Sequence, residues 1–182
     1  MNSKHLFIVG AVVVVAATLY FGTRNISDLP SFGINSGQHM PAPQVTLTDL
    51  SGQKLDLASY KGEVVLVDFW ATWCDPCRAE IPHFVQLQDK YRNQGFRVVG
   101  ISMDDGPRPV REFYGQYRMN YPVAMGNAKV AERFGGVLGL PVSFLIGRDG
   151  RIYARHVGET ETSVFESEIK ELLARPAAAP GL

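Results

Sequence analysis

The stretch FWATWCDPCRAEIP, residues 69–82, contains both cysteines of this 182-residue chain. Cys74 and Cys77 are separated by two residues, and the chain holds no third cysteine with which either could pair. A disulfide that acts as a structural staple is expected to close a longer loop, because its stabilisation grows with loop length. Two cysteines are also too few to form a disulfide scaffold for a core of this size. The pair therefore indicates redox chemistry.

The two cysteines stand at the junction of a predicted strand and a predicted helix. The run EVVLVDFWA, residues 63–71, is almost continuously apolar and predicts a strand buried on both faces of a parallel or mixed sheet. A helix is expected over residues 75–93, with Pro76 in its first turn. Free N–H groups and the helix dipole favour a thiolate on Cys74, which is the attacking species in disulfide exchange. Cys77, one turn later, can then resolve the mixed disulfide.

Asp75, between the cysteines, allows two interpretations. Its negative charge opposes a thiolate on Cys74, which makes the reduced form less favoured and the pair a better reductant. The alternative is that Asp75 caps the helix and points to water.

Two acidic residues are candidates for proton transfer. Asp68 interrupts the apolar strand, where a lone carboxylate is costly unless it has a task or a partner. Desolvation should raise its pKa and suit it to exchange a proton with Cys77. Glu80 lies one helical turn after Cys77 and is a second candidate, with a solvated position on the helix surface as its alternative.

Leu140 and Pro141 open a further predicted strand, LPVSFLIG, residues 140–147. A cis proline here could present backbone groups to an extended peptide, whereas an ordinary proline at the start of a strand is the alternative. The candidate substrate-binding residues lie beside the cysteines or this proline: Trp73, Asp75, Pro76 and Leu140.

The other predicted elements give the fold class. A hairpin over 44–58 precedes the cysteine-bearing strand, and a strand over 96–103, a helix within 104–120 and a short strand over 121–125 follow the first helix. After them come a helix over 127–135, the strand of Pro141, a strand over 151–158 and a helix over 160–175. Thr160 or Thr162 is expected to cap the last helix, and Val164 to face inward with four other apolar residues, Phe165, Ile169, Leu172 and Leu173. Alternating strands and helices predict an α/β fold whose central mixed sheet has helices on both faces.

Both ends of the chain differ in composition from this domain, which is expected over 44–175. About 17 uncharged residues after MNSKH are just long enough to cross a bilayer, so residues 1–22 are expected to be a membrane anchor, or alternatively a cleaved signal segment. Lys4 before this run places the N-terminus in the cytoplasm and the domain outside the membrane. Residues 23–43, rich in Gly, Pro, Ser and Asn, predict a flexible linker, and 176–182 a disordered tail.

Other functions of a cysteine pair have less support. The chain carries 18 Lys and Arg against 18 Asp and Glu, so no basic surface argues for nucleic acid. Zinc needs four ligands, and covalent haem needs His where Arg78 stands. Copper(I) binding by the two thiols stays open, although no methionine cluster lies nearby in the sequence. No metal or other cofactor is expected beyond a redox-active disulfide.

VVLVDFWATWCDPCRAEIP resembles the active-site strand and helix of the thioredoxin superfamily, including the proline five residues after the second cysteine. GLPVSFLIGRDGRI resembles the segment that carries the family's cis-proline. The N-terminal anchor, the first hairpin, the WATWC wording and an inserted helix and strand around 104–125 are similar to the TlpA- and ResA-like branch of exported thiol-disulfide oxidoreductases. The resemblance covers residues 44–173 and implies a thioredoxin-like fold.

The resemblance also implies a function. Members of this branch are anchored to the cell membrane by a single pass, with the catalytic domain on the periplasmic or extracytoplasmic side. They mostly reduce disulfides, in proteins such as apocytochrome c or cytochrome oxidase copper-site proteins, and a membrane thiol carrier of the CcdA or DsbD type recharges them. Their catalytic residues match Cys74, Cys77, Glu80 and Pro141. Many members carry Asn where this chain has Asp68, so the resemblance leaves open which acid handles the proton.

The sequence is therefore compatible with three functions. The first is a membrane-tethered protein-disulfide reductase. The second is a thiol oxidase or isomerase with the same fold, which a reduction potential near the oxidising end of the range would favour. The third is a Cu(I)-binding metal-delivery protein.

Overall fold

The computed structural model describes residues 39–176, and the segments expected to be the anchor, most of the linker and the tail lie outside these residues. Its strands and helices follow the expected order, and the hairpin and the inserted helix and strand are both present. The strands are β1 Thr46–Thr48, β2 Lys54–Asp56, β3 Val64–Trp70, β4 Phe96–Ser102, β5 Val123–Met125, β6 Val142–Ile146 and β7 Ile152–Val157. The helices are α2 Asp75–Tyr91, α3 Pro107–Gln116, α4 Ala128–Arg133 and α5 Thr162–Ala174, with short 3-10 turns η2 Leu57–Tyr60 and η3 Arg92–Gln94.

Strand β3 is the centre of a mixed five-stranded sheet with the order β5-β4-β3-β6-β7. It pairs in parallel with β4 and antiparallel with β6, and every one of its seven residues is buried. The continuous apolar run is explained by this position, because a central strand covered on both faces has no solvent-facing side. Its carboxyl end, at Trp70, leads directly to the cysteines.

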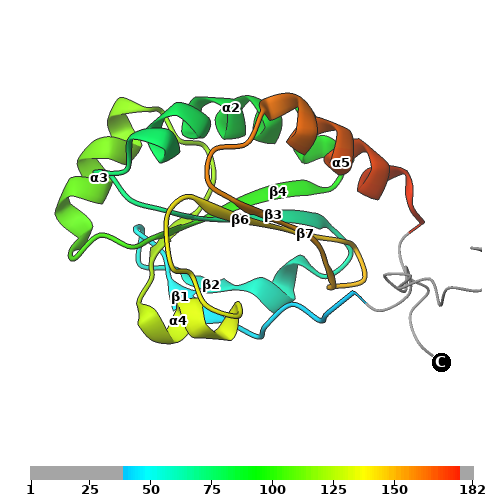
Figure 1. Ribbon diagram of the computed structural model, residues 1–182, viewed down its shortest axis with the longest axis horizontal. Helices are drawn as coiled ribbons and strands as arrows, with labels where there is room; N and C mark the ends of the chain where they lie inside the picture. Colours follow the sequence, from blue (N-terminus) through cyan, green and yellow to red (C-terminus); the bar gives the residue numbers. More distant parts are fainter. Residues whose placement is uncertain (1–38, 177–182) are drawn as a thin grey trace, which may run out of the picture. The chain divides into compact units, whose positions relative to one another are not determined.

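The two faces of the sheet carry separate apolar cores. On one face α2, α3 and α5 cover the β3 residues Val64, Leu66 and Trp70, and on the other face α4 and the β1–β2 hairpin cover Val65, Val67 and Phe69 (Figure 1). Because side chains alternate along a strand, Asp68 belongs to the first face and lies between Leu66 and Trp70, beneath the helices. The sheet thus positions one carboxyl group inside the core under the cysteine-bearing helix.

The folded unit begins before residue 44. Pro41 forms a β-bridge with Arg151, and backbone hydrogen bonds join Ala42 N–H to the Gly150 carbonyl and Ile152 N–H to the Met40 carbonyl. Residues 40–42 of the expected linker are therefore attached to the start of β7.

The predictions for the last helix were wrong in two details. Neither threonine caps α5, because the Thr160 hydroxyl donates to the Gly158 carbonyl and Thr162 is already helical. The N-cap residue is Glu161, whose side chain makes no capping hydrogen bond. Val164 is 40% exposed instead of facing inward, since Phe165, Ile169 and Leu172 form the buried stripe one residue further round the helix. Among the helices of residues 39–176, none combines the length and apolarity needed to cross a bilayer.

Candidate active site

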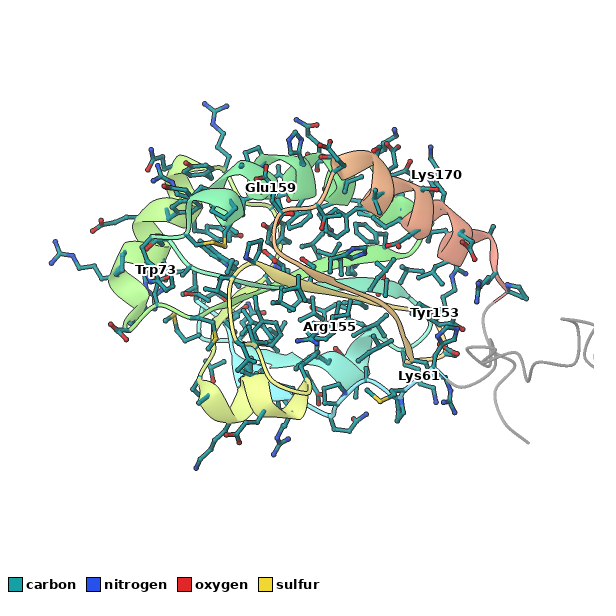
Figure 2. The ribbon with its side chains drawn as sticks, viewed as in Figure 1. Lys61, Trp73, Tyr153, Arg155, Glu159 and Lys170 are labelled. Atoms are coloured by element: carbon teal, nitrogen blue, oxygen red, sulfur yellow. A yellow bond between two sulfur atoms is a disulfide. The ribbon has the colours of Figure 1, made fainter. Side chains whose placement is uncertain are left out.

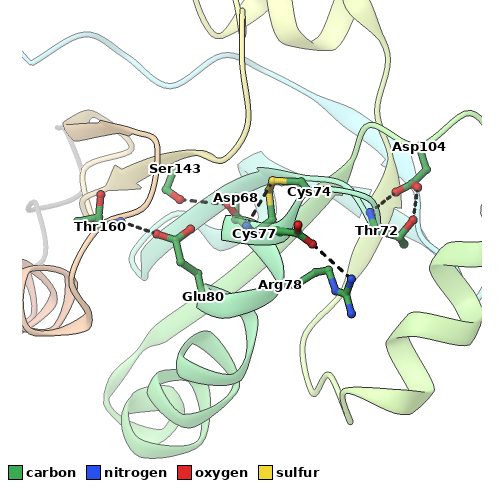
Figure 3. Close-up of a disulfide and its surroundings, with 10 residues drawn as sticks. Asp68, Thr72, Cys74, Cys77, Arg78, Glu80, Asp104, Ser143 and Thr160 are labelled. Atoms are coloured by element: carbon green, nitrogen blue, oxygen red, sulfur yellow. Dashed lines mark hydrogen bonds and ion pairs between the residues drawn. A yellow bond between two sulfur atoms is a disulfide. The ribbon is translucent and has the colours of Figure 1, made fainter.

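Cys74 and Cys77 form a disulfide at the N-terminus of α2. Cys74 is the N-cap residue, and its sulfur accepts a hydrogen bond from the Cys77 N–H at 3.3 Å. Both residues are largely buried, but Cys74 retains 5% of its surface and Cys77 only 1%. Exposure and the helix N-terminus therefore both favour Cys74 as the attacking sulfur and Cys77 as the resolving one. Figure 3 shows the pair with its surrounding polar groups.

Asp104 fixes the loop between β3 and the cysteines, and sequence reasoning missed it. Its carboxylate accepts hydrogen bonds from the Thr72 N–H at 3.0 Å and the Thr72 hydroxyl at 2.5 Å (Figure 3). It also accepts one from the Ser102 hydroxyl at 2.9 Å. One signal was available: β3 and β4 are parallel, so the residues that follow them meet at one edge of the sheet. Three hydrogen bonds to one buried carboxylate thus fix the backbone at Thr72, two residues before Cys74.

Asp68 is buried to 1% exposure, as expected for a strand interior. Loss of solvation raises its pKa to about 8, with the charge of Glu80 as a second cause, while the hydrogen bond from Ser143 acts in the opposite direction. The Ser143 hydroxyl donates to Asp68 Oδ1 at 3.1 Å. An acid that titrates near neutral pH can both take and return a proton, which is the property required of a general base here.

Glu80 is also buried, so the alternative of a solvated position on the helix surface was wrong. Burial raises its pKa to about 7, the Thr160 N–H donates to Oε1 at 2.8 Å and lowers it, and the charge of Glu159 raises it. Its Oε2 atom is buried and forms no hydrogen bond in the described part of the chain. A groove of about 390 Å³ adjoins Glu80 and is lined by Ala79, Glu80, His83, Glu159, Thr160, Glu161 and Thr162.

The residues around the cysteines differ in exposure. The Asp75 side chain is 90% exposed and lies 3.5 Å from Arg78, so it points to water, whereas the cap position belongs to Cys74. Trp73 is 68% exposed, and Figure 2 labels it at the end of the domain that holds the disulfide. Pro76 is half-buried in the first turn of α2. Trp73 therefore leaves a large apolar side chain exposed to solvent directly before Cys74.

The Leu140–Pro141 peptide bond is cis, so this is not an ordinary trans proline at the start of a strand. The Pro141 carbonyl already accepts a hydrogen bond from the Gly158 N–H at 2.9 Å. Leu140 is half-buried and packs against both apolar cores.

The arrangement supports thiol-disulfide exchange. The region around α2 holds a sulfur at a helix N-terminus and a second sulfur bonded to it. It also holds two buried acids, Asp68 with a pKa of about 8 and Glu80 with a pKa of about 7. Within residues 39–176, no group of three or more His, Cys, Asp or Glu side chains is arranged to hold a metal ion.

Comparisons with known proteins agree with this chemistry. Residues 36–173 match the model of the Redoxin family. The thiol-disulfide oxidoreductase ResA of Bacillus thuringiensis subsp. konkukian is 35% identical over 131 residues, which cover 72% of this chain and 76% of that protein. ResA of Bacillus subtilis is 27% identical over 181 residues, covering 99% of each chain.

Solved structures show the same similarity in three dimensions. A thiol:disulfide interchange protein of the thioredoxin family from Chlorobium tepidum has a TM-score of 0.71 and 33% identity, covering 75% of this chain and 98% of that one. A second structure from that organism, described as a putative thiol:disulfide interchange protein DsbE, has a TM-score of 0.70 and 34% identity, covering 75% and 98%.

Proposed function

This chain belongs to the Redoxin family and is a thioredoxin-like thiol-disulfide oxidoreductase, and we propose that it is a membrane-tethered reductant of disulfides in exported proteins. The observation that carries the proposal is the Cys74–Cys77 disulfide at the N-terminus of α2, backed by a buried acid on β3. The proposed reaction uses the two sulfurs alone, without a bound cofactor.

The charged residues beside Cys74 support the proposal that the protein reduces disulfides instead of forming them. Asp75 is the residue that directly follows Cys74, and its carboxylate disfavours a neighbouring thiolate. A less stable thiolate lowers the reduction potential of the pair. The ion pair with Arg78 offsets part of this effect, so the direction is expected to be reducing but only moderately so.

The proposed substrates are disulfides in apocytochrome c before haem attachment, or in cytochrome oxidase copper-site proteins. Trp73 and Leu140 would contact the polypeptide around the target disulfide, because one is exposed beside Cys74 and the other precedes the cis-proline. After each turnover the oxidised pair would be recharged by a membrane thiol carrier of the CcdA or DsbD type. The N-terminal apolar run would hold the domain at the outer face of the cytoplasmic membrane.

The test uses two variants of the full chain in native membranes. Cys74→Ser is expected to abolish insulin disulfide reduction, because it removes the attacking sulfur. Cys77→Ser is expected to accumulate a mixed disulfide between Cys74 and the natural partner, which mass spectrometry then identifies. Insulin reduction that persists in Cys74→Ser would refute the catalytic assignment, and a trapped partner with no link to cytochrome assembly would refute the substrate class.

A further inference from the structure

The sheet gives Asp68 one neighbour with a hydroxyl group and one with no side chain at all. In the strand registers, Asp68 is level with Gly100 of β4 on one side and with Ser143 of β6 on the other. A Cβ atom on Gly100 would lie 3.0 Å from both Trp70 Nε1 and Val123 Cγ2, so the packing leaves little room for a side chain there. Ser143, which is 2% exposed, donates its hydroxyl to Asp68 Oδ1 at 3.1 Å.

The other ionisable or polar groups that face this region do not favour a charged Asp68. Glu80 on α2 raises the pKa of Asp68 by its negative charge. Tyr121, before β5, is buried near Asp68, but its hydroxyl forms no hydrogen bond among the described residues. His156 of β7, level with Ser143, pairs instead with Glu168 of α5 at 2.8 Å. Ser143 is thus the group in the described structure that stabilises the Asp68 carboxylate.

We propose that Ser143 is a positioning residue for disulfide exchange: its hydroxyl holds the Asp68 carboxylate ready to accept the proton of Cys77. This inference rests on the proposed function, and it deepens it by explaining how an acid buried in an apolar strand remains usable as a base. The hydroxyl does not touch the reacting sulfurs. It acts through the orientation and the charge state of Asp68.

The Cys74 thiolate attacks the substrate disulfide, and one substrate sulfur leaves as a thiolate with the electron pair of the broken bond. The Cys77 thiol then gives its proton to the Asp68 carboxylate. The Cys77 thiolate attacks Cys74, the Cys74–Cys77 bond forms, and the second substrate sulfur leaves with its electron pair. The enzyme pair is oxidised, the substrate disulfide is reduced, and both substrate thiolates take protons from water.

The experiment isolates the resolving step with the chromogenic disulfide 5,5′-dithiobis(2-nitrobenzoic acid). The reduced, detergent-solubilised full chain releases one coloured thiolate when Cys74 attacks and a second when Cys77 resolves. Stopped-flow absorbance gives both rates as a function of pH. In Ser143→Ala the carboxylate loses a hydrogen bond, so the second rate is expected to become half-maximal about one pH unit higher, with up to about tenfold loss below that pH. The first rate should not change.

Two further variants separate the hydroxyl from the space it fills. Ser143→Thr and Ser143→Val have almost the same shape, but only Thr keeps the donor. The wild-type pH profile is expected for Thr and the shifted profile for Val, which keeps the test decisive if Ser143→Ala is unstable. Glu80→Gln should move the profile in the acid direction, since it removes a negative charge near Asp68 while keeping an acceptor for the Thr160 N–H.

The inference is overturned if Ser143→Ala and Ser143→Val both retain the wild-type profile of the second rate. It is also overturned if Ser143→Ala shifts that profile equally in an Asp68→Asn background, because the hydroxyl would then act without the carboxyl group. Failure of the wild-type protein to reduce insulin would instead refute the proposed function. The two failures are therefore distinguishable.

Discussion

At the scale of single residues, the protonation of Asp68 depends on the charge of Glu80. Both carboxyl groups are buried on the side of the sheet that α2 covers, and the charge of Glu80 contributes to the raised pKa of Asp68. Two neighbouring acids of this kind share their protons, so a measured pH profile reports the pair. The partners differ in a useful way: Asp68 is bound by a side chain, Ser143, and Glu80 by a backbone N–H, that of Thr160. Only the first donor, the Ser143 hydroxyl, can be removed by substituting its side chain.

The raised pKa of Asp68 predicts that this residue destabilises the folded protein at neutral pH. An unfolded chain loses this proton near the ordinary value of 3.8, whereas the folded chain holds it until about pH 8. Between these values the folded state binds more protons, so the free energy of unfolding falls as pH rises. Each pKa unit corresponds to about 1.4 kcal/mol, so Asp68→Asn should stabilise the oxidised protein by on the order of a few kcal/mol at pH 8 and by much less at pH 5.

Urea unfolding of the oxidised wild type and of Asp68→Asn, at pH 5 and pH 8, measures this difference. Asp89→Asn serves as the control, because it makes the same chemical change at an exposed position near the end of α2. Equal stabilisation by Asp68→Asn at both pH values would show that the Asp68 carboxyl is not perturbed by folding.

The sequence allowed some of these residues to be predicted and not others. Asp68, Cys74 and Cys77 stand out because each breaks or terminates a local pattern. Ser143 and Asp104 do not, since a serine in a strand and an acid in a turn are ordinary locally. Their roles depend on contacts 75 and 32 positions away, with Asp68 and Thr72 respectively. Such contacts follow from strand register, which sequence patterns specify only after the sheet order is known.

At the scale of elements, α2 combines the redox site with the core. It starts at the cysteines, and its buried face, which includes Ile81, Phe84 and Leu87, packs in the same core as β3. Pro82 lies inside it without ending it, although proline cannot donate to the Arg78 carbonyl one turn earlier. Long periodic segments such as this helix were predictable from apolar spacing. The start of α5 was not, because Thr160 is held by its contacts to Glu80 and Gly158 instead of capping the helix.

The first turn of α2 also predicts an effect on the reduction potential. Asp75→Ala removes a negative charge next to Cys74, so the thiolate becomes more stable and the potential should rise. The Asp75 side chain is 90% exposed, and solvent screens it, so we expect a change of about 10 mV that shrinks at high salt. Equilibration with glutathione, followed by acid quenching and thiol alkylation, measures it. Asp89→Ala, near the other end of the helix, provides the control, and a potential that falls in Asp75→Ala would contradict the argument.

At the scale of the whole molecule, the site belongs to one end of the central sheet. The carboxyl ends of β3 and β4 deliver Trp70 and Ser102 to the same edge, and the cis Leu140–Pro141 bond comes directly before β6, which runs antiparallel to β3. The order of the elements along the chain and a mixed central sheet were predicted from the alternation of strands and helices with a closing hairpin. The attachment of residues 40–42 to β7 was not, because that segment has the composition of a linker and its pairing uses only backbone groups.

The proposed side of the membrane can be tested with the two cysteines themselves. The chain contains no others, so a membrane-impermeant maleimide reports the location of the active site alone. In intact spheroplasts treated with a reductant, Cys77→Ser is expected to be labelled at Cys74 as strongly as in permeabilised spheroplasts, because the domain would face outward. Cys74→Ser should label more weakly, since Cys77 is the more buried of the two.

A cytoplasmic protein with an introduced exposed cysteine controls for leakage. Labelling of Cys74 that requires permeabilisation would place the domain in the cytoplasm and remove exported proteins from its possible substrates.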